Sequence, residues 1–153
     1  MSSVPKLHLL ARAVIQDGGH VLLAQARGYA HTFLPGGHVE PGEGLRSCLA
    51  RELAEETDLQ FEVGAFLGVV EYEWRDGSEH RHHELNHLFA AASPGLTRLQ
   101  AVASREPHLT FAWVSMDELD NRALMPPPLR PWLAGRERGS SFFASTLEKL
   151  EKR

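Results

Sequence analysis

Residues 37–59 read GHVEPGEGLRSCLARELAEETDL, and this stretch decides the architecture of the chain. A glycine-rich segment comes first, and the residues 45–57 that follow contain neither Gly nor Pro. Leu, Ala, Glu and Arg dominate there, and all four favour the α-helical conformation. The sequence therefore predicts a tight loop that leads directly into a helix over Leu45–Thr57.

Three carboxylates of this helix share one face. At about 100° per residue, Glu56 lies about 40° from Glu52 around the helix axis, and Glu55 lies about 60° from Glu52 on the other side. The apolar residues Cys48 and Leu49 occupy the same face one turn earlier. A solvated acidic helix end is the simplest interpretation. Yet like charges at these spacings repel, and the C-terminal half of a helix disfavours negative charge.

A bound cation would relieve this repulsion. Carboxylate oxygens are the ligands that hard ions such as Mg²⁺ and Mn²⁺ prefer, and the chain has no Cys and His set at zinc-site spacing. Gly36 and Gly37 let the backbone approach a ligand closely, so a carbonyl there could be a further ligand. Arg51 lies beside the acids and could orient one of them. A metal on carboxylates beside a glycine loop suits the binding of a diphosphate.

The same stretch resembles the Nudix box, G-x5-E-x7-R-E-U-x-E-E-x-G-U, where U is a bulky apolar residue. The matching pattern is Gly37-x5-Glu43-x7-Arg51-Glu52-Leu53-x-Glu55-Glu56-x-Asp58-Leu59. All positions match except Asp58, where the family has a glycine that ends the helix in a left-handed conformation. Asp visits that conformation more readily than most residues, at a cost of roughly 1 kcal/mol, so we expect the change to be tolerated.

The resemblance implies a Mg²⁺ cofactor, for which Mn²⁺ could substitute. Glu52 and Glu56 would bind the metal directly, and the Gly37 carbonyl would complete the site. Glu55 would hold a second metal or a metal-bound water. The implied reaction is attack of water on a phosphorus of a nucleoside diphosphate linked to another group.

Two further roles follow from the resemblance. Arg51 and Glu43 would brace the loop and helix as a buried ion pair. The general base varies among family members, so three candidates stay open: Glu55 in the box, Glu106 in the loop before Leu109, and Glu84 on a strand.

The flanking sequence predicts an α/β (α+β) fold, which the resemblance makes a Nudix-type α/β/α sandwich with a mixed sheet. Leu7–Gln16 is apolar on both faces, which is typical of a central strand. We expect one domain over residues 1–153, because no linker interrupts the chain. Further strands are predicted at 21–26, 60–74, 82–92 and 109–114, and further helices at 115–121, 131–134 and 141–150, the last with an apolar stripe of Phe143, Leu147 and Leu150.

Several residues outside the box are candidates for substrate binding. Arg12, Arg27 and Arg75 could contact the substrate phosphates, although each is more often a surface arginine, and we single out Arg27 because it leads into the glycine loop. Phe33 could stack on a base, as could Tyr72 and Trp74, although core packing is the simpler role for all three. Glu84 is a candidate substrate contact as well as a candidate base.

A group of histidines marks the second half of the chain. They are His80, His82, His83 and His87. Strand alternation places His83 and His87 on the face opposite to His82. Half-buried strand histidines are the simplest interpretation, with a sheet face near the substrate or a transition-metal site as alternatives.

Composition restricts the partners. The chain has 153 residues and a formal net charge of −4, so it lacks the global basic field that strong nucleic-acid binding requires. Cys48 is the single cysteine and cannot form an internal disulfide, and no stretch reaches the ~20 apolar residues of a membrane span. We expect a cytoplasmic protein that binds a small nucleotide and could form a homodimer.

The substrate stays open at this level. Nucleoside triphosphates, dinucleoside polyphosphates and nucleotide sugars are all compatible with the box. ADP-ribose is less favoured, because members that cleave it usually carry a proline in the strands after the box, and none occurs between Pro41 and Pro94. A domain that binds a nucleotide as a sensor, without cleaving it, is the alternative function.

Overall fold

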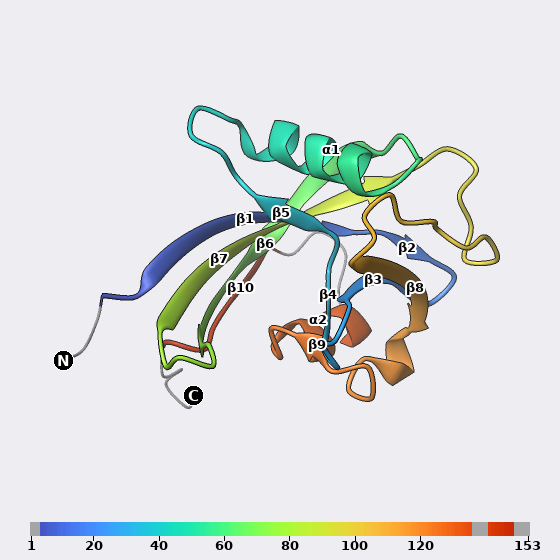
Figure 1. The fold of residues 1–153 in the computed structure, drawn as a ribbon. Coiled ribbons are helices and arrows are strands. Elements are labelled where there is room, and N and C mark those ends of the chain that lie inside the picture. The colour runs from blue at the N-terminus through green and yellow to red at the C-terminus, as the bar shows by residue number, and fades with distance from the viewer. Residues whose placement is uncertain (1–3, 136–140, 149–153) are drawn as a thin grey trace.

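Ten strands and three helices make up the part of the chain that the structure, a computed structural model, describes: residues 4–135 and 141–148 (Figure 1). The helices are α1 (Leu45–Glu56), the 3-10 helix η1 (Met116–Glu118) and α2 (Leu129–Gly135). The strands are β1 (Lys6–Val14), β2 (Gln16–Asp17), β3 (His20–Ala26), β4 (Thr32–Phe33), β5 (Gly36–His38), β6 (Glu62–Arg75), β7 (Arg81–Ala92), β8 (Leu109–Ser115), β9 (Leu124–Met125) and β10 (Phe142–Ser145).

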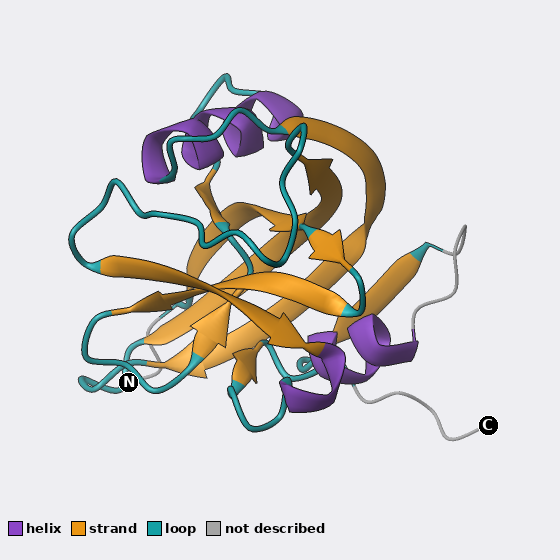
Figure 2. Cartoon of the chain, turned by 90° about the vertical axis from the view of Figure 1, so that its right-hand side faces the viewer, coloured by secondary structure: helices purple, strands orange, loops and turns teal. Residues whose placement is uncertain are grey.

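The strands form two sheets. The first has the order β10-β6-β7-β1-β5, and the second has the order β2-β3-β4-β9 with β8 paired to β3. The first sheet is mixed, because β1 runs parallel to β7 and β10 parallel to β6, whereas β5 runs antiparallel to β1 and β6 antiparallel to β7. Helix α1 packs on the first sheet, and α2 lies on the opposite side of the strands (Figures 1 and 2). The predicted mixed α+β sandwich is confirmed.

Strand β1 is central, as its apolar pattern predicts. Ala11 and Ala13 are fully buried in the cluster that contains Leu49 of α1. Val14, on the other face, is buried in the cluster that also contains Val21 of β3. The strand therefore has apolar layers on both sides along its second half, whereas Leu7 near its start is exposed.

The end of α1 differs from the expected left-handed cap. Thr57 follows the helix in an extended conformation, with φ −130° and ψ 164°. Its hydroxyl donates to the Leu53 carbonyl at 2.8 Å and accepts from the Leu59 N–H at 3.2 Å. Among the described residues only Glu79 and Ala123 have positive φ without being glycine. Asp58 thus avoids the left-handed region, and the buried Thr57 replaces the cap that a glycine would supply.

The predicted C-terminal helix over 141–150 is wrong. Phe142–Ser145 forms β10, which runs parallel to β6 and pairs Phe142 with Gly68. The Phe142 ring stacks on Trp132 of α2 at 4.5 Å between centroids, while Phe143 is exposed. The expected apolar stripe therefore does not exist, and its last member, Leu150, lies outside the described residues. Pairing with a distant strand overrides the local helical pattern.

The other short helices are close to their predicted places. The helix predicted over 115–121 shrinks to η1, with the Ser115 hydroxyl accepting from the Asp117 N–H at 3.4 Å. The helix predicted over 131–134 lies within α2. In the described ranges, no helix combines the length and the hydropathy needed to cross a membrane.

We expect the substitution Thr57→Val to destabilise the fold by about 1–3 kcal/mol, because it keeps the shape of a buried side chain but removes both hydroxyl hydrogen bonds. Urea denaturation measures the change. Thr57→Ser is the matched control, since it keeps the hydroxyl and should cost less. Equal stability of Thr57→Val and the unmodified chain would show that the hydroxyl does not cap the helix.

Candidate functional site

Two glycines bring three elements together at one edge of the first sheet. Gly36 has φ 144°, and a Cβ there would overlap the Ala11 carbonyl of β1. A Cβ at Gly37 would overlap the carboxylate of Glu52 on α1. Only glycine at position 36 therefore allows β5 to pair with β1, and the missing side chain of Gly37 leaves the space that the Glu52 carboxylate occupies.

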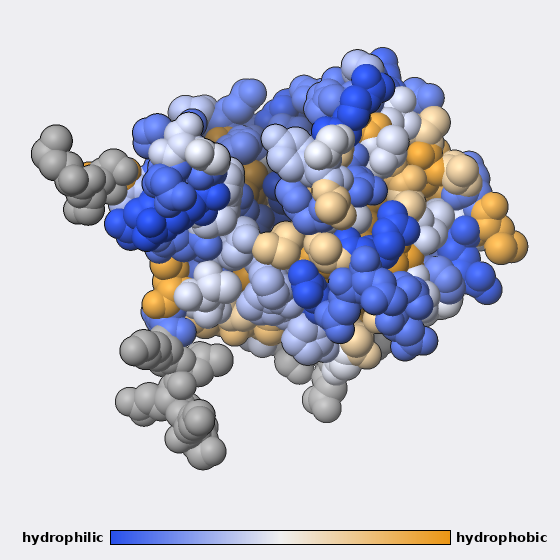
Figure 3. All heavy atoms as spheres, turned by 60° about the horizontal axis from the view of Figure 1, so that its bottom comes forward, coloured by the Kyte–Doolittle hydropathy of each residue, from blue (hydrophilic) through white to orange (hydrophobic). Residues whose placement is uncertain are grey.

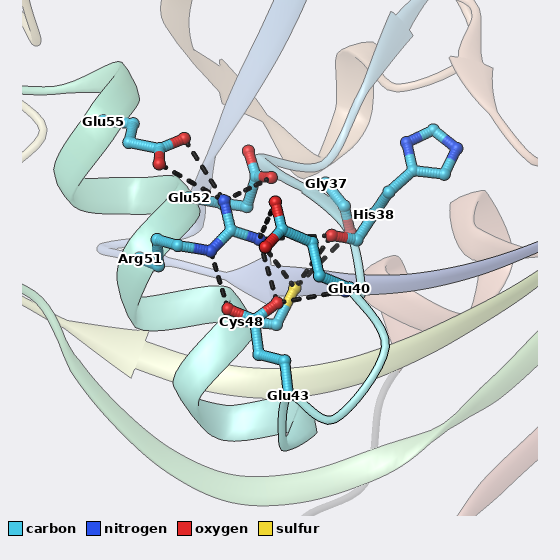
Figure 4. Close-up of polar contacts among 8 residues, drawn as sticks. All are labelled: Gly37, His38, Glu40, Glu43, Cys48, Arg51, Glu52 and Glu55. Atoms are coloured by element: carbon cyan, nitrogen blue, oxygen red, sulfur yellow. Dashed lines mark hydrogen bonds and ion pairs between the residues drawn. The ribbon is translucent and has the colours of Figure 1, made fainter.

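The guanidinium of Arg51 is the centre of the polar contacts (Figure 4). It donates to both carboxylate oxygens of Glu43, at 2.6 and 2.9 Å, and to the His38 carbonyl at 3.3 Å. These hydrogen bonds hold the pKa of Glu43 at about 2. The Glu43 side chain is 15% exposed and that of Arg51 is 27% exposed, so the expected brace between loop and helix is present and largely shielded from solvent.

Arg51 also bonds to two of the three box acids. Its Nη1 lies 3.1 Å from Glu52 and 3.3 Å from both oxygens of Glu55. The guanidinium thus offsets the repulsion that the helical spacing imposes on these carboxylates. In the described ranges, no three His, Cys, Asp or Glu side chains are already arranged around a metal position.

The third acid, Glu56, has a different environment. Its Oε2 atom is buried and has no hydrogen-bond partner among the described residues. Burial and, after it, the charge of the neighbouring Glu52 raise the pKa of Glu56 to about 8, although Arg12 acts in the opposite direction. A buried carboxylate oxygen without a partner is costly, and a cation would remove that cost. The oxygen donors Gly37, Glu52 and Glu56 therefore fit a hard divalent metal.

Arg12 on β1 is one of the three arginines that the sequence analysis named for the phosphates, although Arg27 was preferred there. Its guanidinium donates to the Leu34 carbonyl at 3.1 Å and lies over the Phe33 ring, 5.3 Å from the centroid. The carboxylates that act on it electrostatically are those of Glu84, Glu56 and Glu52. Its signal in the sequence is a single charge within the otherwise apolar run Leu9–Ile15.

The loop that follows β7 brings Glu106 to the end of α1. The Arg105 N–H donates to the Glu56 carbonyl at 2.8 Å, and Ser104 forms an isolated bridge with Thr57. Glu106 is close enough to contribute to the raised pKa of Glu56. A helix end and a loop that are distant in sequence thus bring two carboxylates close enough for the charge of one to act on the other.

Arg27, the predicted phosphate contact, holds this same loop. Its Nη2 donates to the Pro107 carbonyl at 3.1 Å, and its backbone N–H donates to the His108 carbonyl at 2.7 Å. Arg27 does not line the cavity that Phe33 and Glu84 line. Its side chain fixes the segment beside Glu106.

A cavity of about 690 Å³ lies on the face of the first sheet that α1 leaves open, and Arg12 is among the residues that line it. Figure 3 shows a hollow on this side of the molecule. Both Phe33 and Glu84 line it, as their prediction as substrate contacts requires. The lining residues include Arg12, Phe33, Tyr72, Trp74, Glu84 and Asn86.

Hydrogen bonds fix the polar wall of the cavity. The indole N–H of Trp74 donates to Glu84 Oε2 at 2.7 Å, and the Asn86 amide donates to Glu84 Oε1 at 3.3 Å. The Trp74 ring stacks on His82, with 4.1 Å between centroids and 9° between planes. His82 in turn contacts Asp76 at 2.9 Å.

The histidines divide between the two faces of the sheet as predicted. His82 lies on the cavity face and is hydrogen-bonded to His8 at 2.9 Å. His83 pairs with Glu71 at 3.1 Å, and His87 contacts the Leu10 carbonyl at 2.9 Å. In the part of the chain that is described, they do not converge on a metal position.

Comparison with known proteins gives consistent matches. A Bacillus subtilis (strain 168) protein named "Putative 8-oxo-dGTP diphosphatase" is 28% identical over 106 residues, which are 69% of this chain and 64% of that protein. The match therefore spans less than two thirds of the length of this relative.

Solved structures share the fold. The solution structure of the E. coli ORF135 protein is 28% identical, with TM-score 0.55 over 84% of this chain and 87% of that chain. A NUDIX hydrolase from Nitrosomonas europaea is 27% identical, with TM-score 0.61 over 84% and 86%. The MutT protein from Bacillus halodurans, 18% identical, has TM-score 0.68 over 90% and 88%, which shows a common fold.

A family description covers most of the sequence. The model of the NUDIX domain matches residues 6–135, a range that includes the glycine loop, α1, the loop with Glu106 and the cavity. The chain therefore belongs to the NUDIX domain family.

Proposed function

We propose that this protein is a Mg²⁺-dependent hydrolase that cleaves a nucleoside diphosphate linked to another group. The observation that carries the proposal is the buried, partnerless Oε2 of Glu56, which lies near Glu52. Arg12, on which the charges of both acids act, lines a cavity of nucleotide size. The names of the relatives support it, since they include a diphosphatase and a hydrolase. We take residues 1–153 as one catalytic domain.

The metal would be held by the Gly37 carbonyl and the carboxylates of Glu52 and Glu56, with Glu55 available for a second ion. A divalent metal there supplies neutralisation of the diphosphate charge and acidification of water. Mn²⁺ has the same preference for oxygen ligands and could substitute. Arg51 holds Glu52 in place through the 3.1 Å contact, so the site keeps its geometry before the ion arrives.

We assign the general base to Glu106. Both oxygens of Glu55 are bonded to Arg51, and both oxygens of Glu84 accept hydrogen bonds within the cavity wall. In the described ranges, no hydrogen bond or ion pair engages the Glu106 carboxylate, which lies close to Glu56. Its oxygen is therefore free to take the proton of the attacking water. The role of Arg27 is then to position the loop that carries Glu106.

The substrate would lie across the edge of the first sheet. Arg12 stands between the box acids and the cavity, so its guanidinium is placed to bind the phosphates. The base would enter the cavity, where Phe33 and Trp74 offer aromatic surface. We propose a small nucleotide as the partner, because a formal net charge of −4 does not favour nucleic-acid binding.

One observation favours a second candidate function. Arg51 already offsets the charge of Glu52 and Glu55, so the fold does not require a metal to tolerate these two acids. A nucleotide sensor that binds without cleaving could keep the same arrangement.

We expect the substitution Glu56→Gln to lower turnover by about 100-fold or more, because charge stabilisation of several kcal/mol would be lost with the metal ligand. The fold should persist, since a neutral amide replaces a buried, unpaired acid. Hydrolysis would be screened with Mg²⁺, Mn²⁺ or EDTA against nucleoside triphosphates, dinucleoside polyphosphates, nucleotide sugars, ADP-ribose and NADH.

The exposed Glu62 supplies the matched control, and Glu62→Gln should cleave like the unmodified chain. Absence of cleavage of every compound, together with a nucleotide that still raises the melting temperature, would contradict the hydrolase and support the sensor.

We expect Glu106→Gln to lower kcat by about 10²–10⁴-fold with little change in KM, because a general base acts in the transition state and not in binding. Steady-state kinetics on the substrate found in the screen measures both constants. Glu55→Gln is the comparison variant. If Glu55→Gln shows the larger loss of kcat and Glu106→Gln is nearly normal, the base is Glu55.

A further inference from the structure

Glu84 presents a fixed pair of acceptors inside the cavity. Each of its oxygens accepts one hydrogen bond from the protein, Oε2 from the Trp74 indole and Oε1 from the Asn86 amide. A carboxylate has about four lone-pair sites, two on each oxygen. One acceptor site on each oxygen is therefore left, and the carboxylate belongs to a residue that lines the cavity.

The neighbours of Glu84 prevent this carboxylate from turning freely. Trp74 is clamped between its hydrogen bond to Glu84 and the stacked ring of His82, which Asp76 holds at 2.9 Å. Asn86 is only 2% exposed, and its amide also donates to the Val70 carbonyl at 3.4 Å. Rotation of the Glu84 carboxylate would break both of its hydrogen bonds, so the acceptor pair is preorganised.

The charged residues indicate which way a nucleotide would lie in the cavity. Arg12 and Glu84 both line the cavity, and the charges of Glu84 and of the box acids Glu56 and Glu52 all act on Arg12. A substrate whose phosphates bind near Arg12 and the box acids therefore places its base toward Glu84 and Trp74. The group that meets the two acceptors of Glu84 is then an edge of that base.

The bases differ in what they offer to two adjacent acceptors. Guanine has two adjacent donors, N1–H and the N2 amino group, on its Watson–Crick edge. Adenine and cytosine have one amino group beside a ring acceptor. Uracil and thymine have one N3–H between two carbonyl oxygens, and these oxygens would repel the carboxylate. A site whose polar groups stay unpaired when the wrong base is bound discriminates strongly against that base.

We propose that Glu84, held by Trp74 and Asn86, is a specificity-determining residue that selects guanine nucleotides and excludes uracil and thymine nucleotides. This inference rests on the proposed function, because it concerns the base of the nucleotide that the box would cleave. Glu84 then contacts substrate through hydrogen bonds and takes no proton from water.

The test compares kcat/KM for GTP, ITP, ATP, CTP and UTP, which share ribose and triphosphate. GTP should exceed UTP by about 10- to 100-fold, the discrimination of one good bidentate contact, and the difference should lie mainly in KM. ITP, which keeps N1–H but lacks the N2 amino group, should fall between them. Equal values for GTP, ITP and UTP overturn the proposal without any variant being needed.

The variant Glu84→Gln replaces one acceptor by a donor, so the ratio of GTP to UTP should fall by about tenfold or more. Glu71→Gln is the matched control: Glu71 lies on the neighbouring strand and pairs with His83 on the opposite face of the sheet. It should leave the ratio unchanged. A uniform fall of kcat in Glu84→Gln for every nucleotide, with the ratio intact, overturns the proposal.

Binding measurements distinguish a failure of base selection by Glu84 from a failure of the proposed hydrolase activity. Calorimetry of GMP and UMP with the full chain in EDTA measures recognition of the base without metal or cleavage. If GMP binds more tightly than UMP and Glu84→Gln removes the difference, the base site stands even where no triphosphate is cleaved. If triphosphates are cleaved but GMP and UMP bind equally, the hydrolase stands and base selection by Glu84 fails.

Discussion

The paired contact between Arg51 and Glu43 is the constraint on which the site depends. One guanidinium joins the loop after β5 to helix α1 through two short hydrogen bonds, and it also reaches the His38 carbonyl. Because both side chains are largely shielded, the loop cannot separate from the helix without leaving a charge unpaired. The same guanidinium contacts Glu52 and Glu55, so the brace and the acidic face are parts of one network.

The close approach of helix α1 to strand β5 makes this network possible. Gly36 and Gly37 lack the Cβ atoms that would collide with β1 and with Glu52, and the helix therefore lies directly beside the sheet edge. On the other side of that edge is the cavity, and Arg12 faces the carboxylates of both regions. The guanidinium of Arg12, which interacts with both regions, suits a nucleotide whose charged phosphates lie near it and whose flat base enters the cavity.

Some features could be predicted from the sequence and some could not. The helix, its acidic face and its brace to Glu43 all follow from spacing within one short segment, and the structure has them in place. The helix expected at 141–150 failed because pairing of β10 with β6 is a contact between distant segments. The left-handed cap expected at Asp58 is unnecessary because the hydroxyl of Thr57, one position earlier, forms the hydrogen bonds that end the helix.

The sequence by itself determined the family, the helix with its three acids and the two-sided burial of β1, because these depend on residue type and on periods of a few residues. Tertiary structure alone decided that Glu106 lies beside Glu56, that Arg27 holds a loop, and that Arg12 faces the acids of two regions. It also decided that Trp74 and Asn86 fix Glu84 in a cavity wall. Such contacts join segments far apart along the chain, and their geometry depends on how the sheets and α1 pack.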